Sequence, residues 1–293
     1  MTPVTLTDRT RAAQDKARVL REALPWITRW SGRTVVVKFG GSVTDQGAAA
    51  AFAADVALLH SVGLRVVVVH GGGPQITALS QRLGLEATFV EGRRVTDAPT
   101  LEVVKMVLLG QVNPALVGLV QRHGARAVGV AGTDAGLLVA AQADPRLGLV
   151  GDVVHVDPGV LTTLLDDGTV PVVATVARTA DGAEVNVNAD AAAAAVAVAL
   201  GADKLVVLTN VAGLYEDFGT PESALLSEVS ASRLHAMLDT GVLHTGMVPK
   251  VQAVVDALDG GVGAAHLLDG RVEHALLLEI FTDEGIGTMV TAA

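Results

Sequence analysis

Cysteine is absent from the 293 residues of this chain. Its absence excludes disulfide bonds, thiolate nucleophiles and zinc sites built on sulfur, so any site must work with oxygen and nitrogen groups. The chain also lacks a dense block of Lys or Arg, and its net charge is −10. Because nothing in it can neutralise a row of nucleic-acid phosphates, we expect small-molecule chemistry rather than nucleic-acid binding.

A long apolar run is missing as well. The longest apolar stretch, residues 191–200, is too short to span a bilayer and follows directly on Asp190. The amino terminus carries alternating charges where a signal peptide would have an apolar segment. We therefore expect no membrane span and a cytoplasmic location.

Half of the residues are hydrophobic and 18% are charged, which is ample for the core of one extended α/β domain or of two lobes. Short valine-rich runs alternate with longer stretches of helical length, and these runs lie at 35–37, 66–69, 127–130, 170–173 and 205–208. The alternation predicts a mainly parallel sheet with helices on both faces. Ligands of such sheets bind beyond the carboxyl ends of the strands, so the loops after these runs should carry the function.

Two features bear on domain organisation. Residues 8–30 place apolar side chains roughly on one face, which predicts an amphipathic helix that Pro25 should bend or end. At Gly201 the composition changes as a new series of strands and loops begins, and we place a lobe boundary there.

The first two strands should end in glycine-rich loops. Residues 38–42 (KFGGS) bring a lysine and two glycines to a strand end, and residues 70–75 (HGGGPQ) run into a helix. Glycine amides and a helix amino terminus converge there on a site for an anion. Each loop could also be a purely structural turn. Neither fits a dinucleotide or P-loop motif, so those interpretations lose their main support.

Three later segments add polar groups. In residues 91–97 (EGRRVTD), Thr96 or Asp97 could cap a helix that opens at Pro99, and one of the two arginines could fork onto a carboxylate, although adjacent arginines are usually solvated. In residues 184–190 (EVNVNAD), capping could explain Asn188 and Asp190, yet Asn186 alternates in phase with them. In residues 246–250 (GMVPK), a lysine in the first turn of a helix favours a nearby anion.

The ordered set KFGGS, HGGGPQI, RRVTD, NVNAD and GMVPK resembles the N-acetylglutamate kinases of the amino-acid kinase family over nearly the whole chain. This resemblance implies a three-layer αβα sandwich with a mainly parallel central sheet and an added amino-terminal helix. It also implies three parts: an oligomerisation helix (1–31), a lobe for the amino-acid substrate (32–200), and an ATP-binding lobe (201–293).

The resemblance assigns roles to the motif residues. Lys38 and Lys250 would hold the phosphoryl group that ATP transfers to N-acetyl-L-glutamate, and Asp190 would orient both lysines. Magnesium would be carried by the nucleotide, with no metal site on the protein. The remaining contacts would come from backbone amides facing the phosphate (Gly40 and Gly41) and from substrate-binding residues (Gly72, Gly73, Arg94 and Asn186).

The carboxyl-terminal residues 274–288 resemble the arginine-site signature of feedback-inhibited family members, although a plain strand and turn would also fit. The resemblance implies inhibition by L-arginine through His274, Glu279, Gly285 and Gly287. It also implies a homo-hexamer, a trimer of dimers interlaced through the amino-terminal helix.

The sequence departs from the family pattern at Ser42, Thr133 and Thr245, of which Thr133 and Thr245 fall in the expected nucleotide region. Two alternatives stay open: a sister kinase acting on an aminoadipate derivative, and a non-catalytic arginine sensor. Retention of Lys38, Asp190 and Lys250 argues against the sensor.

Overall fold

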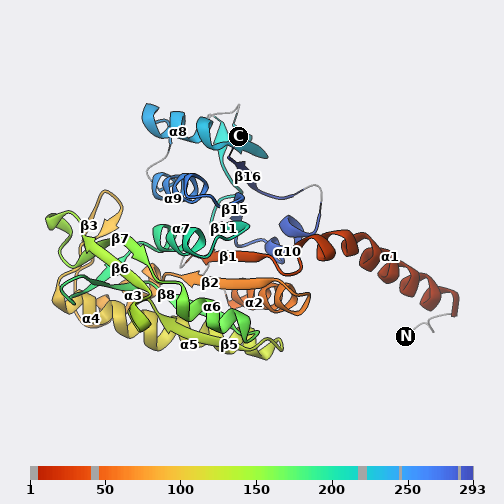
Figure 1. The fold of residues 1–293 in the computed structure, drawn as a ribbon, viewed down its shortest axis with the longest axis horizontal. Helices are drawn as coiled ribbons and strands as arrows, with labels where there is room; N and C mark the ends of the chain where they lie inside the picture. Colours follow the sequence, from red (N-terminus) through yellow and green to blue (C-terminus); the bar gives the residue numbers. More distant parts are fainter. Residues whose placement is uncertain (1–5, 41–45, 217–222, 244–245, 283–284, 293) are drawn as a thin grey trace.

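The computed structural model describes residues 6–40, 46–216, 223–243, 246–282 and 285–292. Its centre is an eight-stranded sheet (Figure 1). In spatial order the strands are β14 (Glu228–Ser230), β16 (Thr288–Thr291), β15 (Ala264–Asp269), β11 (Lys204–Thr209), β1 (Thr34–Phe39), β2 (Arg65–His70), β8 (Val170–Ala174) and β5 (Ala127–Ala131). The six strands from β15 to β5 are parallel, and β16 runs antiparallel to β15. The five predicted valine-rich strands are confirmed.

Valine alternation explains why the sheet is buried on both faces. In β1, Val36 packs into one core cluster while Val35 and Val37 pack into the other, and β2 alternates in the same way. Successive side chains of a strand point to opposite faces, so an unbroken run of valines fills two cores at once.

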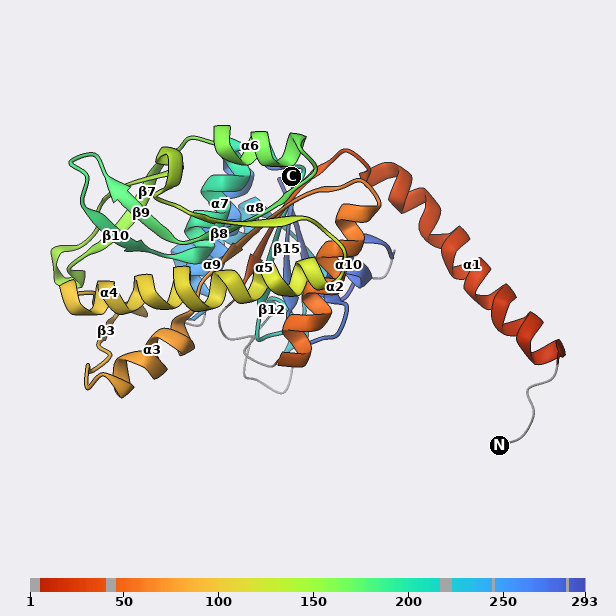
Figure 2. The ribbon, with the colours of Figure 1, turned by 90° about the horizontal axis from the view of Figure 1, so that it is seen from below.

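Helices form the two outer layers, as the sequence predicts for an αβα sandwich (Figures 1 and 2). One layer contains α6 (Gly159–Asp166), α7 (Ala189–Ala199), α8 (Ala231–Thr240) and α9 (Val248–Asp259), and the other contains α2 (Gln46–Ser61), α5 (Asn113–Arg122) and α10 (Ala275–Ile280). The sheet is continuous across Gly201, because β1 lies between β2 and β11. The division into two lobes therefore stays a prediction.

Smaller elements surround the main sheet (Figure 2). A closed barrel consists of β10 (Glu184–Val187), β7 (Val150–Val156), β6 (Leu138–Gln142) and β9 (Val176–Thr179). The other short elements are α3 (Gly73–Arg82), the hairpin strands β3 (Phe89–Val90), β4 (Arg93–Arg94), β12 (Tyr215–Glu216) and β13 (Ala224–Leu225), and the 3-10 turns η2 (Asp134–Gly136) and η3 (Pro145–Leu147). The barrel strands β7, β9 and β10 lie together with α3 and β3 to one side of the main sheet (Figure 2). The barrel and the β3–β4 hairpin supply one wall of the site described below.

Residues 98–122 form one helical run made of α4 (Ala98–Val107), the π-helical turn η1 (Leu108–Val112) and α5. By length and composition alone this run could cross a membrane. The sequence did not suggest it, because polar residues interrupt the run and the longest uninterrupted apolar stretch is residues 191–200. In the fold this helical run covers the sheet, with Leu116 and Val120 buried in the core.

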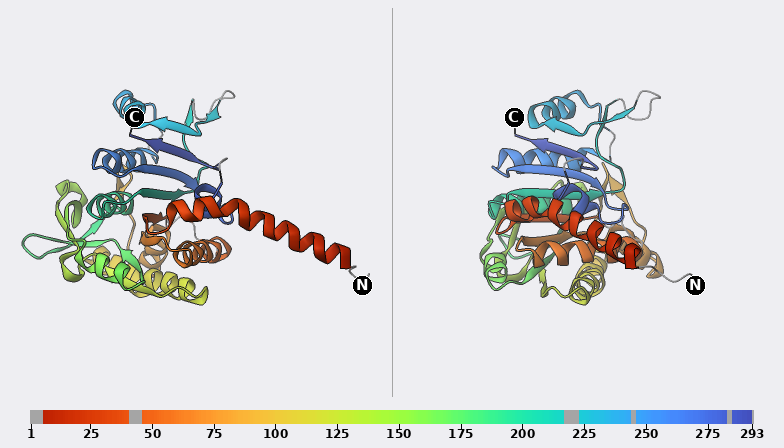
Figure 3. Two further views of the ribbon diagram at one scale, coloured as in Figure 1. Left: turned by 45° about the vertical axis from the view of Figure 1, so that its right-hand side comes forward. Right: turned by 90° about the vertical axis from the view of Figure 1, so that its right-hand side faces the viewer.

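Helix α1 (Leu6–Trp30) projects from the body of the molecule (Figures 1 and 3). The sequence predicts that Pro25 bends or ends this helix. Pro25 lies inside α1 and does not end it, so a bend is the alternative that stays a prediction. A proline removes one backbone hydrogen bond of the helix, whereas Trp30 anchors the helix end in the core beneath it. Val19, Leu20 and Leu24 are exposed along the projecting part.

Candidate active site

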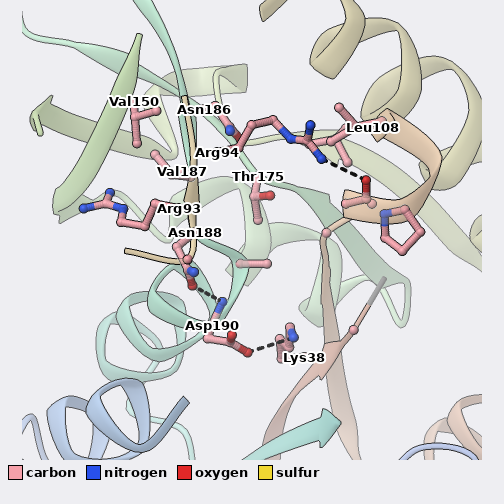
Figure 4. A pocket seen from close by; sticks show the side chains of 18 of the residues that line it. Lys38, Arg93, Arg94, Leu108, Val150, Thr175, Asn186, Val187, Asn188 and Asp190 are labelled. Carbon is pink, nitrogen blue, oxygen red and sulfur yellow. Dashed lines mark hydrogen bonds and ion pairs between the residues drawn. The ribbon is translucent and has the colours of Figure 1, made fainter. Parts of the chain in front are cut away.

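A cavity of about 290 Å³ opens where the carboxyl ends of β1 and β2 meet the amino end of α7 (Figure 4). It brings together almost all of the residues that the sequence singled out for catalysis and substrate binding. The predicted residues that line it are Lys38, Gly40, Gly72, Gly73, Arg94, Asn186, Asp190 and Lys250. Gly41 and Ser42 lie outside the described residues.

Local rules place the charged groups. Lys38 is the last residue but one of β1, and it pairs in register with Val69 of β2 and Val207 of β11. Asn188 caps α7 by accepting from the amides of Asp190 and Ala191, as predicted, which sets Asp190 in the first turn. Lys250 lies in the first turn of α9. Strand β1 and two helix starts thus aim three charges at one point.

Asp190 stands between the two lysines. Its carboxylate oxygens lie 2.8 Å from Lys38 Nζ and 3.0 Å from Lys250 Nζ, and the three side chains are 6%, 7% and 19% exposed respectively. Burial alone would raise the pKa of Asp190, but both lysines lie close enough to hold that pKa below its usual value. Burial lowers the pKa of Lys38, and Asp190 opposes this effect. Asp190 therefore holds one buried and one half-buried ammonium group close together.

Arg94 marks the other end of the cavity (Figure 4). Its Nη2 donates to Gly73 O at 3.1 Å and to Thr77 Oγ1 at 2.7 Å, and its guanidinium carbon lies 4.8 Å from the centre of the Phe89 ring. Nη1 is buried and has no hydrogen-bond partner among the described residues. A buried donor without an acceptor is costly, so this nitrogen points to an anionic ligand.

The neighbouring polar residues separate by role. Arg93 pairs with Asp152 at 2.7 Å, on the rim of the cavity, whereas Arg94 is buried in its wall. Asn186 Nδ2 lies 3.3 Å from Thr96 Oγ1, and Asp97 caps α4 by accepting from the Thr100 amide. Both arginines line the cavity, but Arg93 is paired with Asp152 whereas Arg94 keeps a buried nitrogen without a partner among the described residues.

A second cavity, of about 270 Å³, adjoins the first through Lys250. It follows the carboxyl end of β11 and is lined by Thr209, Gly213, Tyr215 and Met247, among others. Thr133, which the sequence placed near the nucleotide, instead follows β5 at the far edge of the sheet and lines neither cavity. Thr245 lies outside the described residues. Among described residues, no group of three or more His, Asp or Glu side chains could hold a metal ion.

The amino acid kinase family profile matches residues 33–269. The chain belongs to this family. Among curated relatives, the acetylglutamate kinase of Frankia alni is 56% identical over 97% of this chain and 84% of its own length. The predicted family and fold class are confirmed.

Two solved structures of N-acetylglutamate synthase from Neisseria gonorrhoeae resemble this chain. The one complexed with coenzyme A and N-acetyl-glutamate covers 94% of this chain with a TM-score of 0.82 at 28% identity. The one complexed with coenzyme A and L-arginine also covers 94% of this chain, with a TM-score of 0.79 at 26% identity. This chain spans 63% and 65% of those longer chains.

The residues predicted for arginine fall into two groups. Glu279 accepts from His266 Nδ1 at 2.7 Å and from the Ile286 amide at 2.8 Å, beside Gly285 and Gly287. His274 is held by Asp55 of α2, with 2.6 Å between Nδ1 and Oδ1, so its imidazole is engaged away from the Glu279 carboxylate. Asp283 and Glu284 lie outside the described residues.

Sequence reasoning missed two members of the Glu279 group. Lys204 Nζ lies 2.8 Å from His266 Nε2 and 4.5 Å from the centre of the Trp30 ring at the end of α1. Burial lowers the pKa of Lys204 to about 8, although Glu279 opposes this effect. The available signal was a lysine and a histidine inside otherwise apolar strands, which are costly there without partners.

We expect Asp190→Asn to reduce the free energy of unfolding by about 3 kcal/mol, because it leaves the buried Lys38 and the half-buried Lys250 without their shared carboxylate. The pKa of Lys38 should fall further, because Asp190 opposes the lowering of that pKa by burial. Chemical denaturation at neutral pH measures the first effect, and NMR titration of the lysine side chains measures the second.

The matched control is Asp166→Asn, which makes the same chemical change in an exposed pair with Arg65. The decrease in its free energy of unfolding should stay below about 1 kcal/mol. Equal, small losses in the two variants would show that Asp190 does not balance the lysine charges.

Proposed function

We propose that this protein transfers the γ-phosphoryl group of ATP to the side-chain carboxylate of N-acetyl-L-glutamate in the cytoplasm. The product would be N-acetyl-L-glutamyl 5-phosphate, an intermediate of arginine biosynthesis. The observation that carries this proposal is one cavity with paired lysines at one end and a buried, partly unpaired guanidinium at the other. Such a cavity suits a dicarboxylate that reacts at one carboxylate and is gripped by the other. Relatives with the name acetylglutamate kinase support the choice of substrate.

In this mechanism a carboxylate oxygen attacks the γ-phosphorus, an O–P bond forms, and the bond to the ADP oxygen breaks. The nucleophile is already ionised at neutral pH, so no general base is required. The obstacle is repulsion between anions. Lys38 and Lys250 face the transferring group, and charge stabilisation by fixed cations in a partly buried site is worth more than in water. Magnesium bound to the nucleotide would neutralise further charge.

The amides of the glycine loops would contribute next to the lysines. Gly40 lies one residue beyond β1, and Gly72 caps the amino end of α3, where amides of the first turn lack partners within the helix. Arg94 and Asn186 would hold the distal carboxylate and the acetylamino group. The substrate would thus lie along the cavity with its reacting end toward Lys38.

A carrier-linked aminoadipate kinase would need basic residues at the entrance to meet an acidic carrier protein. Arg93, the basic residue on the rim, is already paired with Asp152 at 2.7 Å. This pairing favours a free small-molecule substrate.

The decisive assay compares turnover on N-acetyl-L-glutamate and N-acetyl-L-aminoadipate, with wild type and with Lys38→Met and Lys250→Met. We expect acetylglutamate to be preferred and each lysine variant to lose roughly a hundredfold or more in kcat, the usual effect of removing one transition-state contact. Lys16→Met, an exposed lysine of α1, is the matched control. Lysine variants within about twofold of wild type would contradict the site assignment.

Arg94→Lys should raise the Michaelis constant for acetylglutamate more than that for ATP, because a lysine cannot reproduce a bidentate grip on a carboxylate. The comparison variant is Arg93→Lys, whose guanidinium is paired with Asp152. Steady-state kinetics with each substrate varied in turn distinguishes the two. If Arg94→Lys changed both constants equally, or Arg93→Lys had the larger effect, Arg94 would not be the substrate ligand.

We further propose that L-arginine inhibits the enzyme and that α1 assembles dimers into a hexamer. The exposed apolar residues of α1 need a partner, and another subunit can supply it. The end of α1 touches the buried Lys204–His266–Glu279 chain through Trp30. Glu279 can accept from a guanidinium, which has donors only. The related synthase complexed with L-arginine supports this ligand.

This cluster lies at the amino ends of the strands, whereas the lysine pair lies at the carboxyl ends. Lys204 is the first residue of β11, and Lys38 is near the end of β1. Arginine bound at the first place does not touch the lysine pair, so it would affect that pair by shifting an equilibrium between conformations of the protein.

Deletion of residues 1–29 should yield an active dimer with a weaker response to arginine, because it removes the projecting helix and keeps Trp30. Light scattering gives the mass of the assembly, and inhibition curves give the response. A truncated protein that stays hexameric with unchanged arginine sensitivity would refute this regulation while leaving the kinase proposal intact.

A further inference from the structure

His70 is a buried polar residue that the mechanism above does not use. It ends β2, directly before the loop Gly71–Gly73, and has no exposed surface. Its Nδ1 lies 3.0 Å from Gly71 O, and its Nε2 lies 3.0 Å from Asn113 Nδ2. Asn113 is buried too, and its Nδ2 also lies 2.7 Å from Val172 O of β8.

These contacts fix where the protons are. A carbonyl oxygen only accepts, so Nδ1 of His70 must carry a hydrogen and donate it to Gly71 O. In the neutral imidazole Nε2 is then an acceptor, which matches the amide donor of Asn113. A flipped Asn113 amide would set its oxygen against Val172 O. Burial lowers the pKa of His70 to about 4, so the ring stays neutral at physiological pH.

The hydrogen bond to Gly71 O determines the direction of the next amide. In a planar trans peptide the C=O of Gly71 and the N–H of Gly72 point in opposite directions, and the described chain has no cis peptide. With the carbonyl held toward the His70 ring, the Gly72 N–H is directed away from that ring. A peptide between two glycines otherwise turns over easily, because neither residue has a Cβ.

The surrounding sequence is shaped to make room for Asn113. A Cβ on Gly129 of β5 would overlap Asn113 Oδ1, so this strand position must be glycine. Asn113 follows the π-helical turn, and its backbone N–H donates to Leu108 O five residues back. This wide turn brings Asn113 nearer to the face of Leu108 than an α-helix would, and Leu108 packs against Gly72. One irregular turn therefore supports both sides of the glycine loop.

We propose that His70 and Asn113 are positioning residues that hold the Gly71–Gly72 peptide in the orientation in which the Gly72 amide serves the phosphoryl acceptor. This inference rests on the proposed function for its substrate. Asn113 donates to Nε2 of His70 and so favours the tautomer with a hydrogen on Nδ1. That hydrogen fixes the position of the Gly71 carbonyl oxygen. The planar peptide then determines the direction of the Gly72 N–H. Neither side chain lines the cavity, so both act through the backbone.

The first test compares two replacements of His70. Asparagine places an amide nitrogen where Nδ1 was, whereas glutamine is larger and places its amide near Nε2. We expect His70→Gln to lower kcat roughly tenfold to a hundredfold, with the Michaelis constant for ATP changed less than about twofold. His70→Asn should have a kcat much closer to that of wild type than His70→Gln has. A purely packing role predicts the reverse order, since asparagine leaves the larger void, and that order would overturn the proposal.

The second test perturbs Asn113 from outside the loop. Gly129→Ala should displace the Asn113 amide and reproduce the kinetic defect of His70→Gln, with little further loss in the double variant. Gly118→Ala on α5 is the control, because a Cβ there meets nothing within 4 Å. Thermal melting shows whether each variant folds. Two results would contradict a coupling between Asn113 and His70. One is a decrease in kcat in the double variant that equals the product of the two single effects, and the other is a folded Gly129→Ala protein with wild-type kinetics.

A third readout does not depend on activity. Nitrogen-15 NMR of histidine-labelled protein should show His70 with a protonated Nδ1 and a bare Nε2 at neutral pH, assigned by its absence in His70→Asn. If the wild-type protein failed to phosphorylate acetylglutamate while this tautomer was present, the proposed function would be wrong. The orientation of the Gly71–Gly72 peptide by His70 would still be supported. The opposite tautomer in an active enzyme would overturn the positioning role alone.

Discussion

The candidate site is built around one arrangement of charge, the Asp190 carboxylate between Lys38 and Lys250. Each group comes from a different element, and β1, α7 and α9 must all be in place before the three meet. Burying such charges stabilises a protein weakly or not at all compared with apolar packing. Folding energy therefore does not explain why the chain places them under a cavity. A site for a polyanion does, because two lysines held together by one carboxylate keep one positive charge in excess.

Sequence reasoning succeeded where local physics decides the outcome. The valine runs are strands of a sheet with helices on both faces, as predicted, and Asn188 caps α7. Of the two residues that could have capped α4, Thr96 and Asp97, the structure selects Asp97. It could not show that β11 and β15 are neighbours, and so it missed the contact between Lys204 and His266. Nor could it foresee the π-helical turn that sets Asn113 under His70. The positions of Thr133 and of the His274 imidazole were likewise decided by strand order and packing, which no run of nearby residues records.

The molecule keeps its two sets of buried polar groups at opposite ends of the sheet. Chemistry is gathered at the carboxyl ends, where loops and helix starts converge. At the amino ends, Lys204, His266 and Glu279 form a hydrogen-bonded chain that joins α1 to the last segment of the protein. Helix α2 runs between the two regions. It follows the loop after β1, and through Asp55 it holds His274 at the start of α10. A shift of α10 would therefore act directly on the helix that follows β1, the strand whose carboxyl end brings Lys38 and Gly40 to the main cavity.

Charge distribution explains how an acidic protein can collect anionic substrates. The whole chain carries a net charge of −10, yet the main cavity contains Lys38, Lys250, Arg93 and Arg94, with Asp190 and the rim partner Asp152 opposing them. Partial burial reduces screening by salt, so this local excess of positive charge acts strongly at short range. The same burial lowers the pKa of Lys38 and favours its neutral form. A bound phosphoryl group or carboxylate acts in the opposite direction and favours the protonated lysine. Anion binding and the pKa of Lys38 are therefore linked, because an anion held in the cavity would raise that pKa and favour the charged lysine that attracts it.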